Sequence, residues 1–134
     1  MREIKFRGQR IDNKEWVYGF YNYTFERGHN SQSYDDVPDR CHYIDTDTNY
    51  YEIKGHTVGQ YTGLKDKNGL EIYEGDIIKH DVNMSQVFYN SKHCAFMLNG
   101  IGVKTRGYLR LGQVSFLWIE VIGNTYENPE LLKG

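Results

Sequence analysis

Apolar and polar side chains alternate at the start of the chain with the period of a β-strand. Residues 3–10 show this alternation, and residues 16–25 follow as a longer aromatic segment. Successive side chains of a strand point to opposite faces, so Trp16 and Val17 begin two different faces. Both faces are apolar enough that we expect both to be covered. The intervening Ile11-Asp12-Asn13-Lys14 is typical of a turn, and a β-hairpin is predicted.

Shorter apolar segments between glycine, asparagine and aspartate residues predict further strands. These segments are residues 41–44, 50–53, 58–64, 71–73, 76–80, 86–89, 94–98, 103–111 and 114–122. Asp66-Lys67-Asn68-Gly69 contains the Asn-Gly pair of a type I′ hairpin turn, whose two central residues both need a positive φ. Tyr73-Glu74-Gly75-Asp76 is a second tight turn nearby. Turns so close together indicate a small barrel or a meander.

These segments predict a mainly β fold, a compact antiparallel β domain with a small SH3-like barrel or a meander. Near the end, Asn128 and Pro129 are an N-cap residue and a first-turn proline, which predict a short C-terminal helical turn. Residues 26–42 are polar with little periodicity, and we expect a loop or an insertion there. A chain of 134 residues has the size of one domain, so we expect a single domain over residues 1–134.

Composition indicates an ordered chain, because 39% of the residues are hydrophobic and 15% are aromatic. The formal net charge of −2 excludes the strong positive field of a nonspecific nucleic-acid binder, so nucleic acid is not the favoured partner. Cys41 and Cys94 are too few for the disulfide framework of a small secreted protein, and no segment approaches the roughly 18 apolar residues of a membrane span. We expect free thiols, no membrane and a cytoplasmic location.

Two groups of residues have the composition of a metal site. Asp45-Thr46-Asp47-Thr48-Asn49 has the oxygen spacing that opens a calcium loop, but Tyr50 and His56 stand where such a loop needs glycine and glutamate, so we reject calcium. The ligand types of tetrahedral zinc are present at Cys41, His42, His93 and Cys94. Neighbouring residues of a strand point to opposite faces, which disfavours zinc, although the sequence leaves open whether the four residues converge. We expect neither a metal nor a cofactor.

Local signatures of catalysis, such as a nucleophile elbow or a glycine-rich phosphate loop, do not occur in the sequence. No catalytic residue is therefore assigned, and a non-enzymatic protein is favoured. An enzyme would need a pocket that gathers at least two of the residues that carry suitable side chains. These are His56, His80, His93, Asp76 and Glu120.

Aromatic and polar residues near the two turns form a candidate interaction surface. Its residues are Tyr61, Tyr73, Asp76, Asn124 and Tyr126. Aromatic side chains beside basic ones are how small barrels hold single-stranded nucleic acid. Acidic residues crowd the same stretch here, which favours packing within the fold over a nucleic-acid groove.

Three segments together resemble the YopX family of bacteriophage and prophage proteins. They are residues 2–20, REIKFRGQRIDNKEWVYGF; residues 57–76, TVGQYTGLKDKNGLEIYEGD; and residues 119–132, IEVIGNTYENPELL. The resemblance implies a compact, mainly β protein encoded by phages, with no established activity, cofactor or catalytic residues to transfer.

The favoured function is that of a non-enzymatic phage or prophage accessory protein, which acts through protein contacts in the cytoplasm of a bacterial host. The many aromatic residues without a catalytic cluster indicate a homo-oligomer or a contact with an unknown host or phage protein. One alternative is a nucleic-acid-binding module, because residues 75–79 have the turn-strand pattern of small SH3-like barrels. A second alternative is a small enzyme that acts on a nucleotide or a host metabolite.

Overall fold

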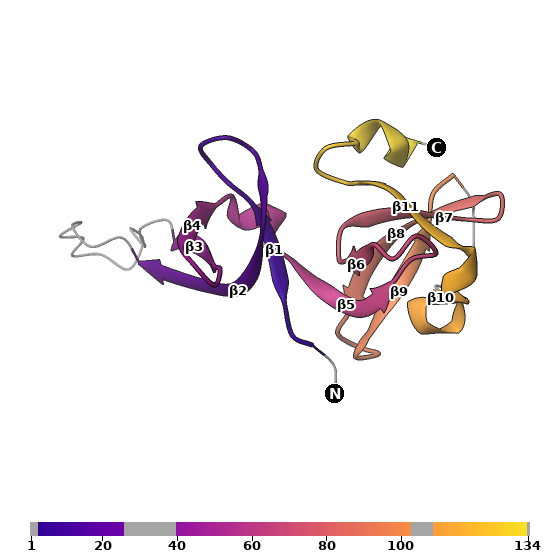
Figure 1. The fold of residues 1–134 in the computed structure, drawn as a ribbon. Helices are drawn as coiled ribbons and strands as arrows, with labels where there is room; N and C mark the ends of the chain where they lie inside the picture. The colour runs from indigo at the N-terminus through magenta and orange to yellow at the C-terminus, as the bar shows by residue number, and fades with distance from the viewer. Residues whose placement is uncertain (1–2, 26–39, 103–108, 134) are drawn as a thin grey trace. The chain divides into compact units, whose positions relative to one another are not determined.

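The structure, a computed structural model, describes residues 3–25, 40–102 and 109–133 (Figure 1). Its contacts divide the chain into two units. The N-terminal unit comprises Lys5–Val58, and the C-terminal unit comprises Met1–Ile4 and Gly59–Gly134. The single domain expected over residues 1–134 stays a prediction. Most of the loop expected at residues 26–42 lies outside the described residues, and its last three residues begin a strand.

The described residues of the N-terminal unit form an antiparallel arrangement of four strands followed by a 3₁₀ turn. The elements are β1 (Phe6–Gln9), β2 (Trp16–Phe25), β3 (Arg40–Asp45), β4 (Tyr50–Ile53) and η1 (Gly55–Thr57). The strands lie in the order β4-β3-β2-β1. The predicted first hairpin is confirmed, because β1 pairs with β2 from Phe6 opposite Gly19 to Gln9 opposite Trp16.

The two faces of this sheet differ in burial. On the covered face, Ile44 is 0% exposed and Ile53 is 3% exposed. Gly8 makes room for Ile53, because a Cβ atom at Gly8 would lie 2.2 Å from the Ile53 Cδ1 atom. On the opposite face, Tyr18 and Phe20 are exposed. The expectation that both faces of the second strand are covered is therefore wrong for this face.

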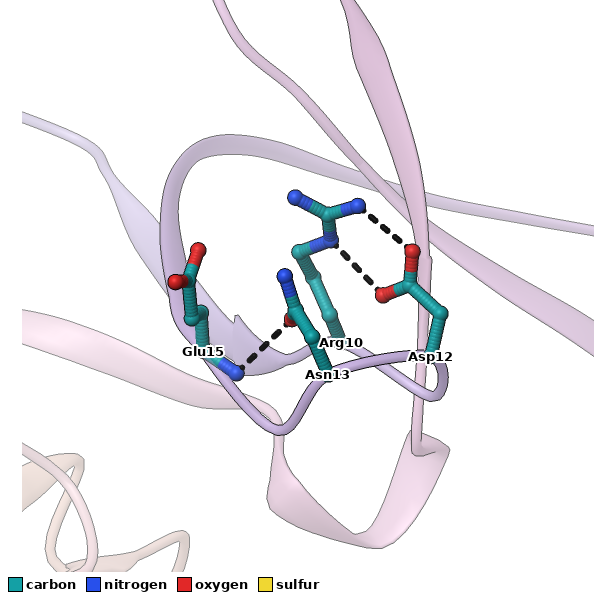
Figure 2. A network of polar contacts seen from close by, with 4 residues as sticks. All are labelled: Arg10, Asp12, Asn13 and Glu15. Atoms are coloured by element: carbon teal, nitrogen blue, oxygen red, sulfur yellow. Dashed lines mark hydrogen bonds and ion pairs between the residues drawn. The ribbon is translucent and has the colours of Figure 1, made fainter.

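The turn between β1 and β2 is held by side chains (Figure 2). The Arg10 guanidinium donates two hydrogen bonds to the Asp12 carboxylate, at 2.9 Å and 2.5 Å, and Asn13 Oδ1 accepts the Glu15 backbone N–H at 3.0 Å. The same guanidinium lies 4.4 Å from the centre of the Tyr51 ring, a cation–π contact with β4. Arg10 therefore links the turn to the neighbouring part of the sheet.

This pair gives a prediction about titration. The hydrogen bond from Arg10, with its charge, holds the pKa of the Asp12 carboxyl below its ordinary value of 3.8. A carboxyl whose pKa is lower in the folded state than in the unfolded state stabilises the fold at pH values above the unfolded-state pKa. This stabilisation is lost as the pH falls through the folded-state pKa. Because both side chains lie at the surface, we expect the effect on stability to be small.

We expect Arg10→Gln to raise the Asp12 pKa toward 3.8, and an NMR titration of the carboxyl carbon would measure it. Arg110→Gln in the C-terminal unit is the control and should leave the Asp12 midpoint unchanged. An unchanged midpoint in Arg10→Gln would mean that the guanidinium does not hold the carboxylate in solution.

The described residues of the C-terminal unit form a hairpin, a five-stranded antiparallel sheet and three 3₁₀ turns. The strands are β5 (Gly59–Lys65), β6 (Glu71–Tyr73), β7 (Asp76–His80), β8 (Asn83–Asn90), β9 (Ala95–Gly100), β10 (Leu109–Arg110) and β11 (Ile119–Asn124). The turns are η2 (Leu111–Gln113), η3 (Phe116–Trp118) and η4 (Pro129–Lys133). The sheet has the order β10-β9-β8-β7-β11, so β7 to β10 form a meander and β11 adds beside β7.

A single apolar core holds this unit together. Its buried residues are Ile72, Ile78, Val87, Leu98, Leu111 and Ile119. They come from β6, β7, β8, β9, η2 and β11, so six of the ten described elements of this unit contribute one side chain each. The mainly β class, the antiparallel meander and the short C-terminal helical turn are confirmed. No helix within the described ranges is long and apolar enough to cross a membrane.

Two local predictions are wrong. The predicted type I′ turn is not formed, because in the Asn68-Gly69 pair only Gly69 has a positive φ, +83°, and Asn68 does not. Asp66 C=O accepts the Gly69 N–H, and a left-handed glycine after such a turn is another common hairpin solution. The strand expected at 114–122 begins only at Ile119, because residues 116–118 form η3. Most of the strand expected at 103–111 lies outside the described residues.

Candidate interaction surfaces

The five residues proposed from the sequence as an interaction surface all lie in the C-terminal unit, where they make contacts within the fold. Tyr61 and Tyr73 lie opposite each other across β5 and β6, with ring centres 5.4 Å apart, and are 5% and 2% exposed. Asp76 is 1% exposed and accepts the Tyr73 backbone N–H at 2.8 Å. These three side chains are therefore buried in the fold.

The remaining two residues of that surface are half-buried around a turn. Asn124 Oδ1 accepts the backbone N–H groups of Tyr126 and Glu127 at 3.0 Å and 2.9 Å. The Tyr126 ring lies close to Gly75, where a Cβ atom would come within 3.0 Å of it. These contacts give Asn124 and Tyr126 a role in stabilising the turn, and their role in binding a partner stays a prediction.

The four candidate zinc ligands divide between the two units. Cys41 and His42 lie on β3 of the N-terminal unit, and His93 and Cys94 precede β9 in the C-terminal unit. Both thiols are free. The His42 ring stacks on Tyr21, and its Nδ1 atom lies 2.6 Å from the Tyr21 hydroxyl. Within the described ranges, no three histidine, cysteine or acidic side chains group as a metal site.

The residues that an enzyme would need are not found in the two hollows described next. His80 Nε2 lies 3.2 Å from the Ser85 hydroxyl oxygen, and Glu120 forms an ion pair with Lys67 at 3.3 Å. Asp76 holds the turn after β6, as stated above. Each of these side chains thus has a local structural partner.

The N-terminal unit presents an exposed sheet face, which we call the aromatic face. Residues opposite each other in an antiparallel pair point to the same side, so the register assigns its members. They are Tyr18, Phe20, Asn22 and Thr24 of β2, Cys41, Tyr43 and Asp45 of β3, and Tyr50 and Glu52 of β4, with the buried Arg7 of β1 on the same side opposite Tyr18. Phe20, within β2, is 68% exposed, and Tyr50, at the start of the edge strand β4, is 67% exposed.

An open hollow of about 320 Å³ lies on the aromatic face. It is lined by Asn22, Thr24, Tyr43, Asp45 and Tyr50, and we call it the tyrosine hollow. The Tyr43 and Tyr50 rings meet edge to face, with centres 5.9 Å apart and an angle of 72° between their planes. The Asn22 amide donates to Asp45 Oδ2 at 2.9 Å. Partial burial, followed by the neighbouring Cys41, raises the pKa of Tyr43 above its ordinary value.

The C-terminal unit exposes an apolar segment at η3, which we call the apolar turn. Phe116, Leu117 and Trp118 are 56%, 63% and 69% exposed. The turn is closed by the Trp118 N–H, which bonds to the Ser115 C=O at 3.0 Å. The Ser115 hydroxyl also accepts the Leu117 N–H at 3.4 Å. Such a local side-chain bond to the backbone competes with the sheet ladder, which is why the apolar segment does not continue as a strand here. Three consecutive large apolar side chains are therefore exposed to solvent.

A second hollow, of about 430 Å³, lies in the same unit. Its lining comes from β5, β9, β10 and η2 and includes Leu64, Phe96 and Arg110. The lining is mainly apolar, and among the described residues Arg110 is the one charged side chain that contributes to it. It contains none of the acids or histidines that an enzyme would need.

Comparison with known proteins places the chain in a family. The family model described as YopX protein matches residues 5–133, nearly the whole chain. The chain belongs to the YopX family. The resemblance seen in its three sequence segments is thereby confirmed, and the YopX match includes residues of both units.

The curated proteins include no match to this YopX chain. Among solved structures, it is similar to the crystal structure of protein EF1440 from Enterococcus faecalis. The two share 24% sequence identity over 98% of this chain and 99% of that chain, with a TM-score of 0.54. At this identity the likeness concerns the fold alone.

Neither the aromatic face nor the apolar turn was proposed from the sequence as a surface. The apolar turn has a signal that could have shown it, because residues 111–119, LGQVSFLWI, contain no charge. The tyrosine hollow has no such signal. Its residues come from three strands, and only the register of β2, β3 and β4 brings them to one side.

Proposed function

We propose that this YopX chain is a non-enzymatic accessory protein of a bacteriophage or prophage, which acts in the bacterial cytoplasm through protein contacts and forms a homo-oligomer. The observation that carries the proposal is the exposure of three consecutive large apolar side chains, Phe116, Leu117 and Trp118, in the apolar turn. The resemblance of the chain to phage and prophage proteins supports the setting.

Exposed apolar residues that occur singly are normal on protein surfaces, but a contiguous group marks a contact site. Tryptophan and phenylalanine are enriched at the centres of interfaces, where they supply most of the binding energy. Closed two-fold dimers are the commonest oligomers, and they bring the same surface of both copies together. Because residues 111–119 carry no charge, the apolar turn can meet its own copy without opposing like charges.

The test is the oligomeric state of the full chain, measured by sedimentation velocity at several micromolar concentrations. We expect a dimer or a larger species, and a double variant Phe116→Ser/Trp118→Ser should weaken association by about tenfold or more. Both side chains are mostly exposed, so the fold should survive, and circular dichroism would verify it.

The matched control is Val82→Ser, which removes a single apolar side chain of the same unit that is 85% exposed. It should leave association unchanged, because an isolated exposed residue contributes little to an interface. A wild-type chain that stays a monomer at every concentration would contradict the homo-oligomer. Equal association of wild type and double variant would remove the apolar turn from the interface.

A further inference from the structure

We infer that the tyrosine hollow on the aromatic face binds an arginine side chain of a partner protein. The site is separate from the apolar turn, since its five lining residues all belong to the N-terminal unit. It therefore adds a second contact, with a defined chemistry, to the oligomer proposed above.

The arrangement of the rings is the first reason. Tyr43 and Tyr50 are set at 72° to each other with centres 5.9 Å apart, so they form two sides of a corner. A cation is attracted to the faces of aromatic rings, and the guanidinium of arginine can also stack flat on one of them. A hollow of about 320 Å³ is at the small end of the range of ligand pockets, roughly 300–1,000 Å³, and suits one side chain.

The charge of the face is the second reason. Asp45 lies opposite Tyr50, and Glu52 lies opposite Tyr43, so each ring has a carboxylate beside it. Both acids are exposed, and no lysine or arginine pairs with either of them in the part of the chain that the structure describes. The Asn22 amide orients Asp45 through Oδ2, which leaves Oδ1 to accept a hydrogen bond from a bound guanidinium.

The same charges select among possible occupants. Two copies of the aromatic face placed against each other would oppose Asp45 and Glu52 of one copy to those of the other, which is unfavourable. Nucleic acid would bring phosphate groups toward these carboxylates, which is also unfavourable. A partner that presents a guanidinium gains both the ring contacts and the ion pair, and is therefore the occupant that fits.

The experiment titrates the full chain with N-acetyl-arginine amide and follows the ring and amide signals of the hollow by NMR. The neutral isostere N-acetyl-citrulline amide is the matched control ligand. We expect saturable shifts at Tyr43 and Tyr50 with the arginine probe at millimolar concentration and much smaller ones with citrulline. An equal response to the two probes, or none to arginine, would overturn the proposal.

Variants locate the site. Asp45→Asn and Tyr50→Ala should each weaken arginine binding by about fivefold, the loss of one exposed cation–π contact or ion pair. Phe20→Ala, on the same face but outside the hollow, should change it by less than about twofold. Equal losses in all three variants would contradict a site in the hollow.

The two proposals fail separately. The Phe116→Ser/Trp118→Ser variant should keep arginine binding, and Asp45→Asn should keep the oligomeric state, because the surfaces are distinct. If the shifts at Tyr43 and Tyr50 appear with a single-stranded oligonucleotide and not with arginine, the aromatic face stacks bases and the arginine site is wrong.

Discussion

Asp66→Ala is expected to lower the free energy of unfolding of the C-terminal unit by about 3 kcal/mol. Asp66 is 3% exposed, and its carboxylate accepts three backbone N–H groups. Oδ1 accepts those of Asn68 and Leu70 at 2.8 Å and 2.9 Å, and Oδ2 accepts that of Val121 at 3.0 Å. Alanine would leave all three donors without this acceptor, and it would remove one of the ties between the β5–β6 turn and β11, beside the Lys67 N–H bond to the Ile119 C=O.

Urea denaturation, with hydrogen exchange to locate the change, would measure the effect. Asp66→Asn should cost less, about 1–2 kcal/mol, because its carbonyl oxygen can replace Oδ1 while its amide group cannot accept the Val121 N–H. Asp47→Ala, an exposed aspartate of the other unit, should change stability by no more than about 0.5 kcal/mol. If Asp66→Ala matched Asp47→Ala, the carboxylate would not hold the turn.

Gly19→Ala is expected to destabilise the N-terminal unit by about 3 kcal/mol, at the upper end of the usual cost of overpacking. A Cβ atom at Gly19 would lie 2.0 Å from the Asp45 backbone oxygen and 2.9 Å from its carbonyl carbon. A backbone carbonyl cannot turn aside as a long side chain can. The pairing of β2 with β3 must therefore open near Phe20 and Asp45, which lie opposite each other.

The same variant connects the fold to the proposed site, because the tyrosine hollow is built on the β2–β3 register. We expect Gly19→Ala to speed hydrogen exchange of the β2 and β3 amides and to weaken arginine binding together with stability. Gly112→Ala is the matched control, since a Cβ atom there meets nothing within 4 Å. Stability of Gly19→Ala equal to that of Gly112→Ala would show that the strands accommodate the side chain.

Most of the fold follows from local patterns. The alternation in residues 16–25 predicts a long strand, and β2 is Trp16–Phe25. The Asn-Gly pair predicts a hairpin at Asp66–Gly69, which is present with a different turn type. The turn type differs because Asp66 binds two N–H groups inside the turn and one on β11, a contact 55 residues away that no local rule contains.

The candidate surfaces were far less predictable than the strands. Tyr61, Tyr73 and Asp76 have the chemistry of an interaction surface, but pairing and core packing bury all three. Conversely, Phe20 and Tyr50 are large aromatic residues of the kind expected in a core, but their side chains are exposed to solvent. Burial of an aromatic side chain depends on which face of its sheet is covered, and a strand pattern with two apolar faces does not indicate the side.

The sequence by itself determined the mainly β class, the positions of most strands, the short C-terminal helical turn and membership of the YopX family. These depend on local alternation, on turn residues and on the residue order within single segments. Only the tertiary structure decided which aromatic residues face water and which residues meet in the tyrosine hollow. The physical reason is that burial and cross-strand contacts are set by register between segments far apart in the chain, and a shift of one residue exchanges the two faces of a strand.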